Sequence, residues 1–356
     1  MKTIVLTGGG TTGHVSVNLT LIPHLLERGW NIHYIGSKGG IEESLVSKFK
    51  EVKYHAISTG KLRRYWSKEN LKDMFRVGKG IFQAKKIFKQ VKPNIVFSKG
   101  GFVSVPVVLA AKWSKVPIIT HESDMTPGLA NKIGLPFATK ICYTFEDTKK
   151  HVPEEKGLFL GAVVRDELFK GSRDKGFELT GFSATKPVIL VTGGSQGANS
   201  INGFIRGQLD ELLKTFQIIH LCGKNKKESR LEDREGYLQY EYVTDELPHL
   251  YAISDLVITR AGSNTIFELL ALRKPMVLVP LPDTQSRGDQ LQNADYFKRQ
   301  GYAEVIKDEK LKGREAVEVI KGAFSNRFDY VEEMRKQAVQ NPTDKLLSLI
   351  EDYKKS

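Results

Sequence analysis

Residues 258–268 read ITRAGSNTIFE, and this stretch decides how the second half of the chain folds. The apolar residues 256–258, which lead into it, are typical of a buried strand. A turn is predicted at Gly262, and either Ser263 or Asn264 can cap the helix that follows. Because N–H groups at such a helix start bind anions, Gly262 and Ser263 are candidates for contact with a phosphate group.

Glu268 lies about one turn inside the predicted helix and faces the same side as the turn. A carboxylate does not bind phosphate, but it accepts hydrogen bonds from vicinal hydroxyls such as those of a ribose. One element thus offers donors for a diphosphate and an acceptor for a sugar, which suits a nucleotide-sugar. An ordinary strand, turn and helix of an α/β domain would also explain these residues.

The length of 356 residues exceeds the usual size of one domain, so two domains are expected. An apolar content of 40% without low-complexity tracts indicates a globular protein. Cys142 and Cys222 lie far apart in apolar runs, which favours reduced core thiols and a cytoplasmic compartment. The N-terminus leads straight into a predicted strand without a signal peptide, and no apolar run is long enough to span a bilayer.

The net charge of +13 is unevenly distributed along the chain. Residues 1–160 contain 25 Lys and Arg against 12 Asp and Glu, whereas residues 161–356 contain 29 of each kind. Within the first half, residues 61–92 alone contain 11 bases and 2 acids. This localisation predicts an anionic surface or partner for the first half of the chain.

The chain consists of two similar halves, each opening with an apolar strand and a glycine-rich turn. These openings are residues 4–10, IVLTGGG, and residues 188–197, VILVTGGSQG. Strand and helix patterns alternate after each, which predicts an α/β fold of two doubly wound parallel sheets. The predicted strands are 4–7, 32–35, 54–57, 95–98, 118–120 and 141–143, then 188–192, 217–221, 238–242, 256–259, 276–280 and 303–306. A linker is expected at 161–166, and apolar side chains at helical spacing in 342–356 predict a last helix that packs on the first domain.

Residues 8–14, GGGTTGH, contain the spacing of a dinucleotide-binding fingerprint. Such a site also needs an acid at the end of the second strand, and residues 34–38, YIGSK, contain none. A backbone that approaches a ligand closely explains the glycines as well. His14, at the predicted helix start, can act as a base or as a hydrogen-bond donor near neutral pH, although a structural role is also possible.

Two further polar motifs follow predicted strands of the first half. Gly100-Gly101 is a second close-approach turn, and His121-Glu122 precedes a helix that contains Asn131. Because ligands of open α/β sheets bind beyond the carboxyl ends of the strands, these motifs should share one rim with His14. Alternatively, His121 and Glu122 form a satisfied polar pair under a loop. No cluster has metal-ligand spacing.

Aromatic and apolar residues interleave with the bases of residues 61–92. One helical stripe is predicted to pack on the sheet and consists of Met74, Val77, Ile81, Ala84, Phe88 and Val91. Other aromatic and basic residues fall outside that stripe and favour an anionic membrane interface: Arg63, Arg64, Trp66, Phe75, Lys79, Phe82 and Lys86. Nucleic acid is the competing partner, but no nucleic-acid-binding motif is present.

Taken in order, these motifs resemble one enzyme family over nearly the whole chain. They are GGGTTGH at 8–14, GG at 100–101, HE at 121–122 with GLAN at 128–131, GGSQGA at 193–198, and RAG at 260–262 with Glu268. The sequence is similar to the MurG family, the UDP-N-acetylglucosamine–N-acetylmuramyl-(pentapeptide) pyrophosphoryl-undecaprenol N-acetylglucosamine transferases. The resemblance implies a GT-B fold, with two Rossmann-like domains and a cleft between them.

The resemblance also implies how the chain is divided and what each part binds. Residues 1–164 with 342–356 would form the acceptor-binding, membrane-associating domain, and residues 165–341 the UDP-GlcNAc-binding domain. The implied partners are UDP-GlcNAc, the undecaprenyl-linked acceptor lipid I, an anionic membrane surface, and cell-wall synthesis and division proteins. The implied location is the cytoplasmic side of the cell membrane, as a peripheral protein.

The resemblance further implies roles for individual residues on the donor side. Glu268 would accept hydrogen bonds from the ribose, and Val243 would offer backbone groups to the uracil. The diphosphate would meet Ser195, the Gly193-Gly194 turn and Arg165. Gln290 and Asn293 would reach the N-acetylglucosamine. The sequence has Asp289-Gln290 where the family has a Gln-Gln pair, so that the expected sugar contact rests on Gln290.

On the acceptor side, His14 is the first candidate for the catalytic base and Glu122 the second. Thr11, Thr12, Gly13 and Asn131 are expected to complete the UDP-GlcNAc site from this side. The implied reaction is an inverting glycosyl transfer that needs neither metal nor cofactor. Two alternatives are a related GT-B enzyme that glycosylates diacylglycerol and a non-catalytic nucleotide-sugar or dinucleotide sensor.

Overall fold

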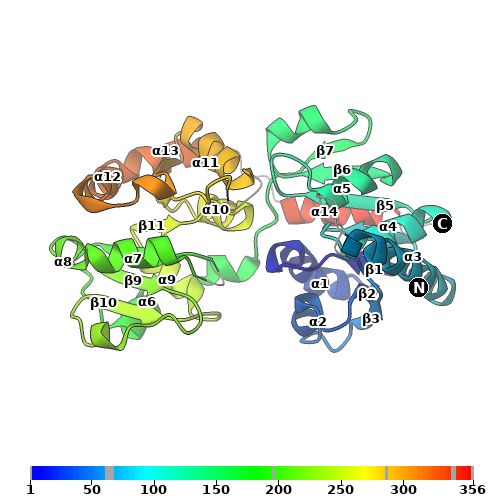
Figure 1. Ribbon diagram of the computed structural model, residues 1–356, viewed down its shortest axis with the longest axis horizontal. Helices are drawn as coiled ribbons and strands as arrows, with labels where there is room; N and C mark the ends of the chain where they lie inside the picture. The colour runs from blue at the N-terminus through cyan, green and yellow to red at the C-terminus, as the bar shows by residue number, and fades with distance from the viewer. Residues whose placement is uncertain (1, 61–67, 195–196, 285–287, 338–341, 354–356) are drawn as a thin grey trace. The chain divides into compact units, whose positions relative to one another are not determined.

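The structure is a computed structural model that describes residues 2–60, 68–194, 197–284, 288–337 and 342–353 (Figure 1). The chain divides into two compact units. The first is Met1–Val163 with Gln340–Ser356, and the second is Val164–Val339. The predicted linker, residues 161–166, contains the boundary between them.

The first unit contains a seven-stranded parallel sheet in the order β3-β2-β1-β4-β5-β6-β7. Its strands are β1 (Thr3–Thr7), β2 (Asn31–Ser37), β3 (Lys53–Ile57), β4 (Ile95–Ser98), β5 (Ile118–Glu122), β6 (Lys140–Tyr143) and β7 (Gly157–Phe159). Its helices are α1 (Ser16–Glu27), α2 (Ile41–Val46), α3 (Lys68–Val91), α4 (Ser104–Trp113), α5 (Leu129–Gly134) and α14 (Pro342–Glu351), with short 3₁₀ turns η1 (Thr12–His14), η2 (Leu135–Phe137) and η3 (Glu146–His151).

Helices cover both faces of this sheet, which is why its strands are continuous apolar runs. In β1, Ile4 and Leu6 belong to a core that includes residues of α1 and α14, whereas Val5 belongs to a core with α3 and α4. Side chains alternate between the two faces of a strand, so both faces of β1 must be apolar.

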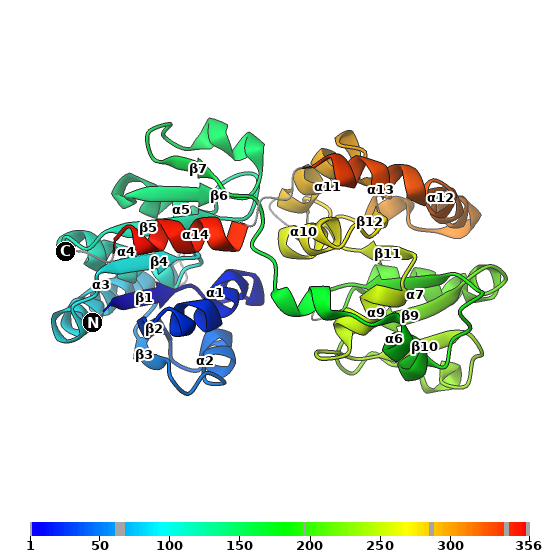
Figure 2. The same cartoon turned by 180° about the vertical axis from the view of Figure 1, so that it is seen from behind.

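The C-terminal helix α14 returns to the first unit, as its apolar spacing predicts. Leu346, Leu347 and Ile350 are fully buried in the core shared with α1. Glu351, at its end, accepts a hydrogen bond of 2.6 Å from Trp30 Nε1. Figure 2 shows α14, in red, beside α1.

The second unit repeats the plan with six parallel strands in the order β10-β9-β8-β11-β12-β13. The strands are β8 (Val188–Thr192), β9 (Gln217–Leu221), β10 (Tyr237–Tyr240), β11 (Leu256–Thr259), β12 (Met276–Leu278) and β13 (Ala303–Val305). The helices are α6 (Arg173–Thr180), α7 (Asn199–Gly207), α8 (Leu209–Leu212), α9 (Leu247–Ile253), α10 (Ser263–Ala271), α11 (Asp289–Arg299), α12 (Gly313–Ser325) and α13 (Arg327–Lys336), with η4 (Asp166–Lys170), η5 (Ser229–Leu231) and η6 (Asp308–Lys310).

The prediction of two doubly wound parallel sheets is therefore confirmed, and both sheets reverse their strand order beside the first strand. In the first unit β1 lies between β2 and β4, and in the second β8 lies between β9 and β11. Ligands of such sheets bind in the crevice outside the carboxyl ends of the strands at this reversal. The glycine-rich residues 8–10 and 193–197 directly follow these two strands.

Three local predictions are wrong or incomplete. The edge strand β7 has only three residues, none of them buried, so no apolar run indicates it. Helix α10 begins at Ser263 and its N-cap is Gly262, so neither Ser263 nor Asn264 caps it. Met74 is 63% exposed, because the buried face of α3 contains Asp73 at that turn and continues through Val77.

A histidine pair in the first unit, formed by buried His33 and half-buried His55, predicts acid sensitivity. His33 Nδ1 lies 2.8 Å from His55 Nε2, and burial, His55 and Lys53 together lower the pKa of His33 to about 4. In the unfolded chain the pKa returns to about 6.5. The neutral form therefore stabilises the fold fully above pH 6.5, and this contribution is lost as the pH falls towards 4.

Between pH 7.5 and 5, the free energy of unfolding should fall by about 2 kcal/mol through His33. Urea denaturation at the two pH values measures this. His33→Gln should reduce the loss, whereas the exposed control His151→Gln should retain it. Equal pH dependence in His33→Gln and wild type would contradict the assignment.

Candidate functional site

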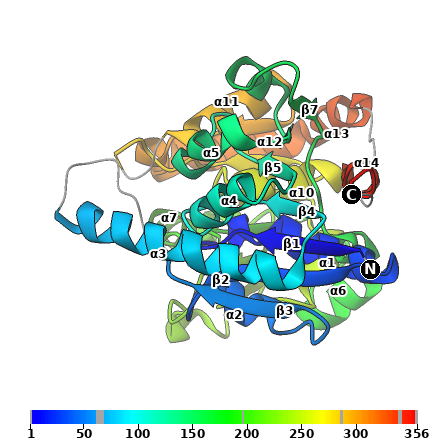
Figure 3. The same ribbon diagram turned by 90° about the vertical axis from the view of Figure 1, so that its right-hand side faces the viewer.

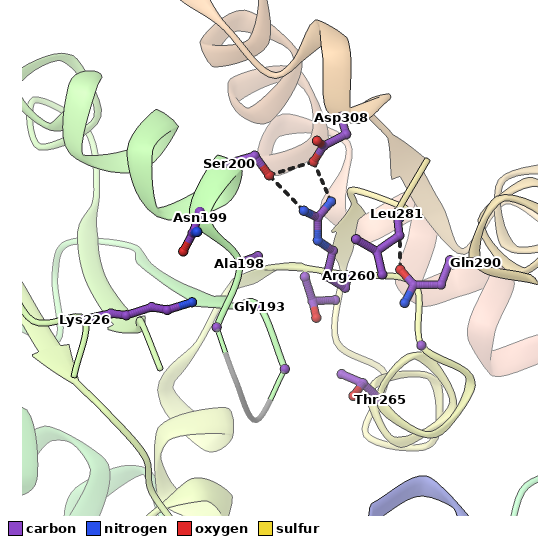
Figure 4. A pocket seen from close by; sticks show the side chains of 14 residues that line it. Gly193, Ala198, Asn199, Ser200, Lys226, Arg260, Thr265, Leu281, Gln290 and Asp308 are labelled. Atoms are coloured by element: carbon purple, nitrogen blue, oxygen red, sulfur yellow. Dashed lines mark hydrogen bonds and ion pairs between the residues drawn. The ribbon is translucent and has the colours of Figure 1, made fainter. Parts of the chain in front are cut away.

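A pocket of the second unit has a volume of about 560 Å³ and lies at the strand reversal (Figure 4). It brings together the ends of β8 and β11, the starts of α7 and α10, and residues from α11 and η6. The residues that line it are Gly193, Gly194, Gly197, Ala198, Asn199, Ser200, Lys226, Thr259, Arg260, Gly262, Thr265, Leu281, Gln290 and Asp308.

The turn after β8 requires glycine on conformational and steric grounds. Gly194 and Gly197 have φ angles of +83° and +69°, a region that side chains disfavour. A Cβ at Gly197 would also collide with the carbonyl oxygen of Cys222. The turn thus leads tightly into α7, whose first residues, Asn199 and Ser200, line the pocket. A helix start at a pocket is the arrangement of an anion site.

Arg260, which follows β11 and is buried, forms a polar cluster with two half-buried residues at the side of the pocket. Its Nη1 lies 2.5 Å from Asp308 Oδ1 and its Nη2 donates to Ser200 Oγ at 2.8 Å. Ser200 Oγ in turn donates to Asp308 Oδ1 at 2.7 Å, as Figure 4 shows. Asp308 therefore balances the charge of Arg260, and the cluster ties α7, β11 and η6 together.

Arg165 and Glu268 form an ion pair within the second unit. Arg165 Nε and Nη2 each lie 3.1 Å from Glu268 Oε1. Burial raises the pKa of the Glu268 carboxyl and Arg165 opposes this rise. Glu268 is three residues beyond Thr265 on α10, so both face the same side of the helix. The structure thus joins two residues predicted for ribose and diphosphate.

The remaining donor-side predictions have different surroundings. Gln290 lines the pocket and its Oε1 accepts a hydrogen bond of 3.0 Å from Leu281 N. Asn293 is 1% exposed and its Nδ2 donates to Ala261 O at 3.1 Å, which places it behind the turn before α10. Val243 is buried in the loop after β10 and does not line the pocket. Ser195 lies outside the described residues.

His14 ends the short turn η1 that follows the first glycine-rich turn. Its Nδ1 lies 2.9 Å from Thr11 Oγ1. Gly101 approaches the ring so closely that a Cβ there would lie 3.1 Å from Nδ1, and its φ of +79° also favours glycine. His14 therefore lies against the Gly100-Gly101 turn, as predicted. Thr11 and Thr12 are exposed beside it.

Glu42, which the sequence motifs do not indicate, holds this glycine-rich turn in place. It is fully buried at the start of α2. Its Oε2 accepts from Gly10 N at 3.1 Å and its Oε1 from Ser37 N at 2.9 Å. The Gly10 N–H group, which a pyrophosphate would need, thus already donates to the Glu42 carboxylate. This argues against dinucleotide binding in the first unit.

Glu122, at the end of β5, shapes the loop that leads to α5. Its Oε1 accepts from Asp124 N at 2.9 Å, and its Oε2 accepts from Gly128 N at 3.0 Å and Asn131 Nδ2 at 2.8 Å. Burial is the largest cause that raises the pKa of its carboxyl. Asn131 packs against Gly100, where a Cβ would lie 2.7 Å from Oδ1. Glu122 and Asn131 are thus hydrogen-bonded to each other, and Asn131 lies against Gly100.

The buried face of α3 packs on the sheet and on α4, and its other face is exposed (Figure 3). Phe75 and Phe82 are 77% and 69% exposed. Lys79 and Lys86 are also exposed, and each lies four residues after one of these phenylalanines, on the same side of the helix. Trp113, at the end of α4, is also exposed, and Lys85 Nζ lies 5.7 Å from its ring centroid. Arg63, Arg64 and Trp66 lie outside the described residues. Within the described segments, every helix is too short or too polar to cross a bilayer.

Sequence reasoning missed several residues of these sites. Arg260 ends a strand and could have been proposed from that position alone. Ser200, Lys226 and Asp308 come from three separate connections and have no common sequence signal. Trp113 closes an apolar run and therefore resembles a core residue.

Comparisons with known proteins identify both halves of the chain. Residues 4–143 match the glycosyltransferase family 28 N-terminal domain, and residues 188–349 match the glycosyltransferase family 28 C-terminal domain. The UDP-N-acetylglucosamine–N-acetylmuramyl-(pentapeptide) pyrophosphoryl-undecaprenol N-acetylglucosamine transferase of Clostridium tetani is 51% identical over 352 residues, which cover 99% of this chain and 98% of that protein. The transferase of the same name from Geobacillus thermodenitrificans is 52% identical over 351 residues, 99% of both chains.

Solved structures show the same fold. The crystal structure of Acinetobacter baumannii MurG has a TM-score of 0.78 at 25% identity and covers 99% of this chain and 100% of its own. The calicheamicin glycosyltransferase CalG4 has a TM-score of 0.71 at 13% identity, with 99% and 98% coverage, and is similar in fold alone. The predicted GT-B fold class is confirmed.

Proposed function

The chain belongs to the MurG family of glycosyltransferases, and we propose that it transfers N-acetylglucosamine from UDP-GlcNAc to lipid I. The acceptor group is the C4 hydroxyl of the muramyl residue in undecaprenyl-pyrophosphoryl-MurNAc-pentapeptide. The product is lipid II, and the role is a step of peptidoglycan synthesis.

One observation of the second unit carries this proposal. Its pocket combines a glycine-rich turn, the starts of two helices and a face of α10 that continues to Glu268. Backbone N–H groups suit the diphosphate, and the carboxylate of Glu268 suits the ribose hydroxyls. Arg165, which orients Glu268, can also reach towards the nucleotide. Gln290, which lines the pocket, would contact the N-acetylglucosamine. For Asn293 and Val243, the sugar and uracil contacts stay predictions from the family resemblance.

The reaction is an inverting displacement. The acceptor C4 oxygen donates an electron pair to the anomeric carbon, the bond from that carbon to the β-phosphate oxygen breaks, and its electron pair leaves on UDP. The hydroxyl proton goes to His14. If His14 Nδ1–H donates to Thr11 Oγ1, the lone pair lies on Nε2 and can accept that proton. Glu122 is held by three N–H donors, so we assign it to shaping the acceptor loop with Asn131.

The leaving diphosphate gains negative charge as its bond to the sugar breaks. Helix starts and glycine turns place preorganised dipoles at such a charge without reorganisation. In the second unit, we assign this role to Gly193, Gly194 and Gly262, which line the pocket, and to Ser263, which begins α10.

The exposed face of α3 is proposed as the surface that binds the cytoplasmic side of the cell membrane. An acceptor linked to undecaprenyl pyrophosphate is anchored in a bilayer and is anionic. Exposed Phe75 and Phe82 provide apolar contact, and Lys79 and Lys86 provide positive charge. Each base near an anionic surface contributes about 1 kcal/mol, within roughly a Debye length.

Replacing Lys79 and Lys86 by Gln should weaken binding to vesicles that contain anionic lipid. The expected loss is about 2 kcal/mol, or roughly 30-fold, at low salt. Sedimentation with anionic and neutral vesicles measures it. The control Lys48→Gln with Lys50→Gln removes the same charge from an exposed loop between α2 and β3. Raised salt should weaken wild-type binding without abolishing it, and binding that ignores lipid charge would contradict the membrane role.

Acceptor choice tests the proposed function against related activities. The purified chain is incubated with labelled UDP-GlcNAc and either lipid I or diacylglycerol, and label in the lipid fraction is measured. Label on lipid I alone supports the proposal. Label on diacylglycerol would reassign the acceptor, and nucleotide-sugar binding without transfer to either lipid would indicate a sensor.

A further inference from the structure

Lys226 is the lysine that lines the second-unit pocket, and the proposed function does not use it. It lies in the connection after β9, between the exposed residues Lys224 and Lys227. Lys226 itself is only partly exposed. In Figure 4 its side chain extends along the pocket so that the amine points towards the Gly193 turn, on the same side as Asn199.

The backbone around Lys226 is fixed in this orientation. The preceding Asn225 has a φ of +58°, a left-handed conformation that turns the chain. Arg206 Nη2 donates to Lys226 O at 2.5 Å and to Gln239 Oε1 at 2.8 Å, and Arg206 Nη1 bonds Glu228. The partly buried Arg206 therefore anchors the segment from which Lys226 enters the pocket.

Among the described residues, the two arginines considered for the pocket are each paired with a carboxylate, whereas Lys226 is not. Arg260 is balanced by Asp308 and both its terminal nitrogens already donate hydrogen bonds. Arg165, predicted for the diphosphate, also pairs with Glu268, which offsets its positive charge. Within the part of the chain that the structure describes, the Lys226 amine has neither an ion pair nor a side-chain hydrogen bond, so it is available for an anionic ligand.

We propose that Lys226 binds the diphosphate of the nucleotide-sugar and stabilises it as it leaves. This inference rests on the proposed function, because it assigns a further residue to the same donor pocket. An ammonium group interacts more strongly with the β-phosphate as the bond to the sugar breaks and charge accumulates there. Lys226 should therefore affect both the affinity for UDP and the rate of transfer.

Calorimetric titration of the full chain with UDP, UMP and uridine tests this assignment. Lys226→Met should weaken UDP binding about tenfold and leave uridine binding unchanged, because only the phosphate contact is lost. Lys226→Arg should retain most of the affinity. The control Lys224→Met removes an exposed lysine two residues away that does not line the pocket, and it should match wild type.

The titration separates this inference from the proposed function. If wild type binds UDP and the Kd of Lys226→Met for UDP is within twofold of the wild-type Kd, the role of Lys226 is overturned and the proposed function stands. If Lys226→Met weakens uridine and UDP equally, the residue does not act on phosphate and the inference is also overturned. If wild type binds no UDP, the proposed function itself fails. With lipid I and saturating UDP-GlcNAc, kcat of Lys226→Met should also fall.

Discussion

His14→Ala is expected to lower kcat by about 10²–10⁴-fold while UDP binding stays nearly unchanged. In the proposed mechanism His14 removes the hydroxyl proton in the transition state, whereas the donor nucleotide contacts residues of the second unit. Steady-state kinetics with lipid I and calorimetry with UDP measure the two effects.

The contact between His14 and Thr11 refines this prediction. Thr11→Val removes the partner that lies 2.9 Å from Nδ1 and should shift the acidic limb of the pH–rate profile without removing it. His14→Ala should abolish that limb. A kcat near the wild-type value in folded His14→Ala would return His14 to a structural role.

Glu268→Ala is expected to raise the KM for UDP-GlcNAc far more than the KM for the acceptor. Losing a charged hydrogen bond to the ribose costs about 1.5–3 kcal/mol, which is roughly 10- to 150-fold. A donor with 2′-deoxyribose gives an independent comparison. Wild type should discriminate against it, and Glu268→Ala should discriminate less.

The ion pair with Arg165 requires a control for this variant, because the alanine releases the guanidinium. Glu268→Gln retains the shape of the side chain and should show a smaller loss. Glu235→Ala removes an exposed acid of the same unit and should behave as wild type. Unchanged donor KM in folded Glu268→Ala would rule out the ribose contact.

The sequence predicts the fold well because parallel sheets covered on both faces require continuous apolar strands. The runs that lead to Gly8 and Gly193 form β1 and β8, which are interior strands of the two sheets. Edge strands lack this requirement, so the exposed β7 gives no signal. The start of α10 was misplaced because Ser263 and Asn264 resemble caps but lie inside the helix.

The sequence predicts site residues that belong to recognisable motifs. It does not predict residues from other parts of the chain that approach these motifs only in the folded structure. His14 and Glu268 follow or lie near glycine-rich turns, and Gln290 occupies a position that the family resemblance implies, so these three could be named from sequence. Glu42 and Asp308 come from other connections and meet the sites only after the sheets form. Their carboxylates bind groups inside the protein, so no local pattern distinguishes them from surface acids.

Release of UDP from UDP-GlcNAc, with and without lipid I, tests the central claim most directly. The proposed transfer predicts that UDP appears rapidly with lipid I, that one lipid II forms for each UDP, and that little UDP appears without the acceptor. UDP release that is independent of lipid I, or no release with it, would contradict the claim that this chain transfers N-acetylglucosamine to lipid I.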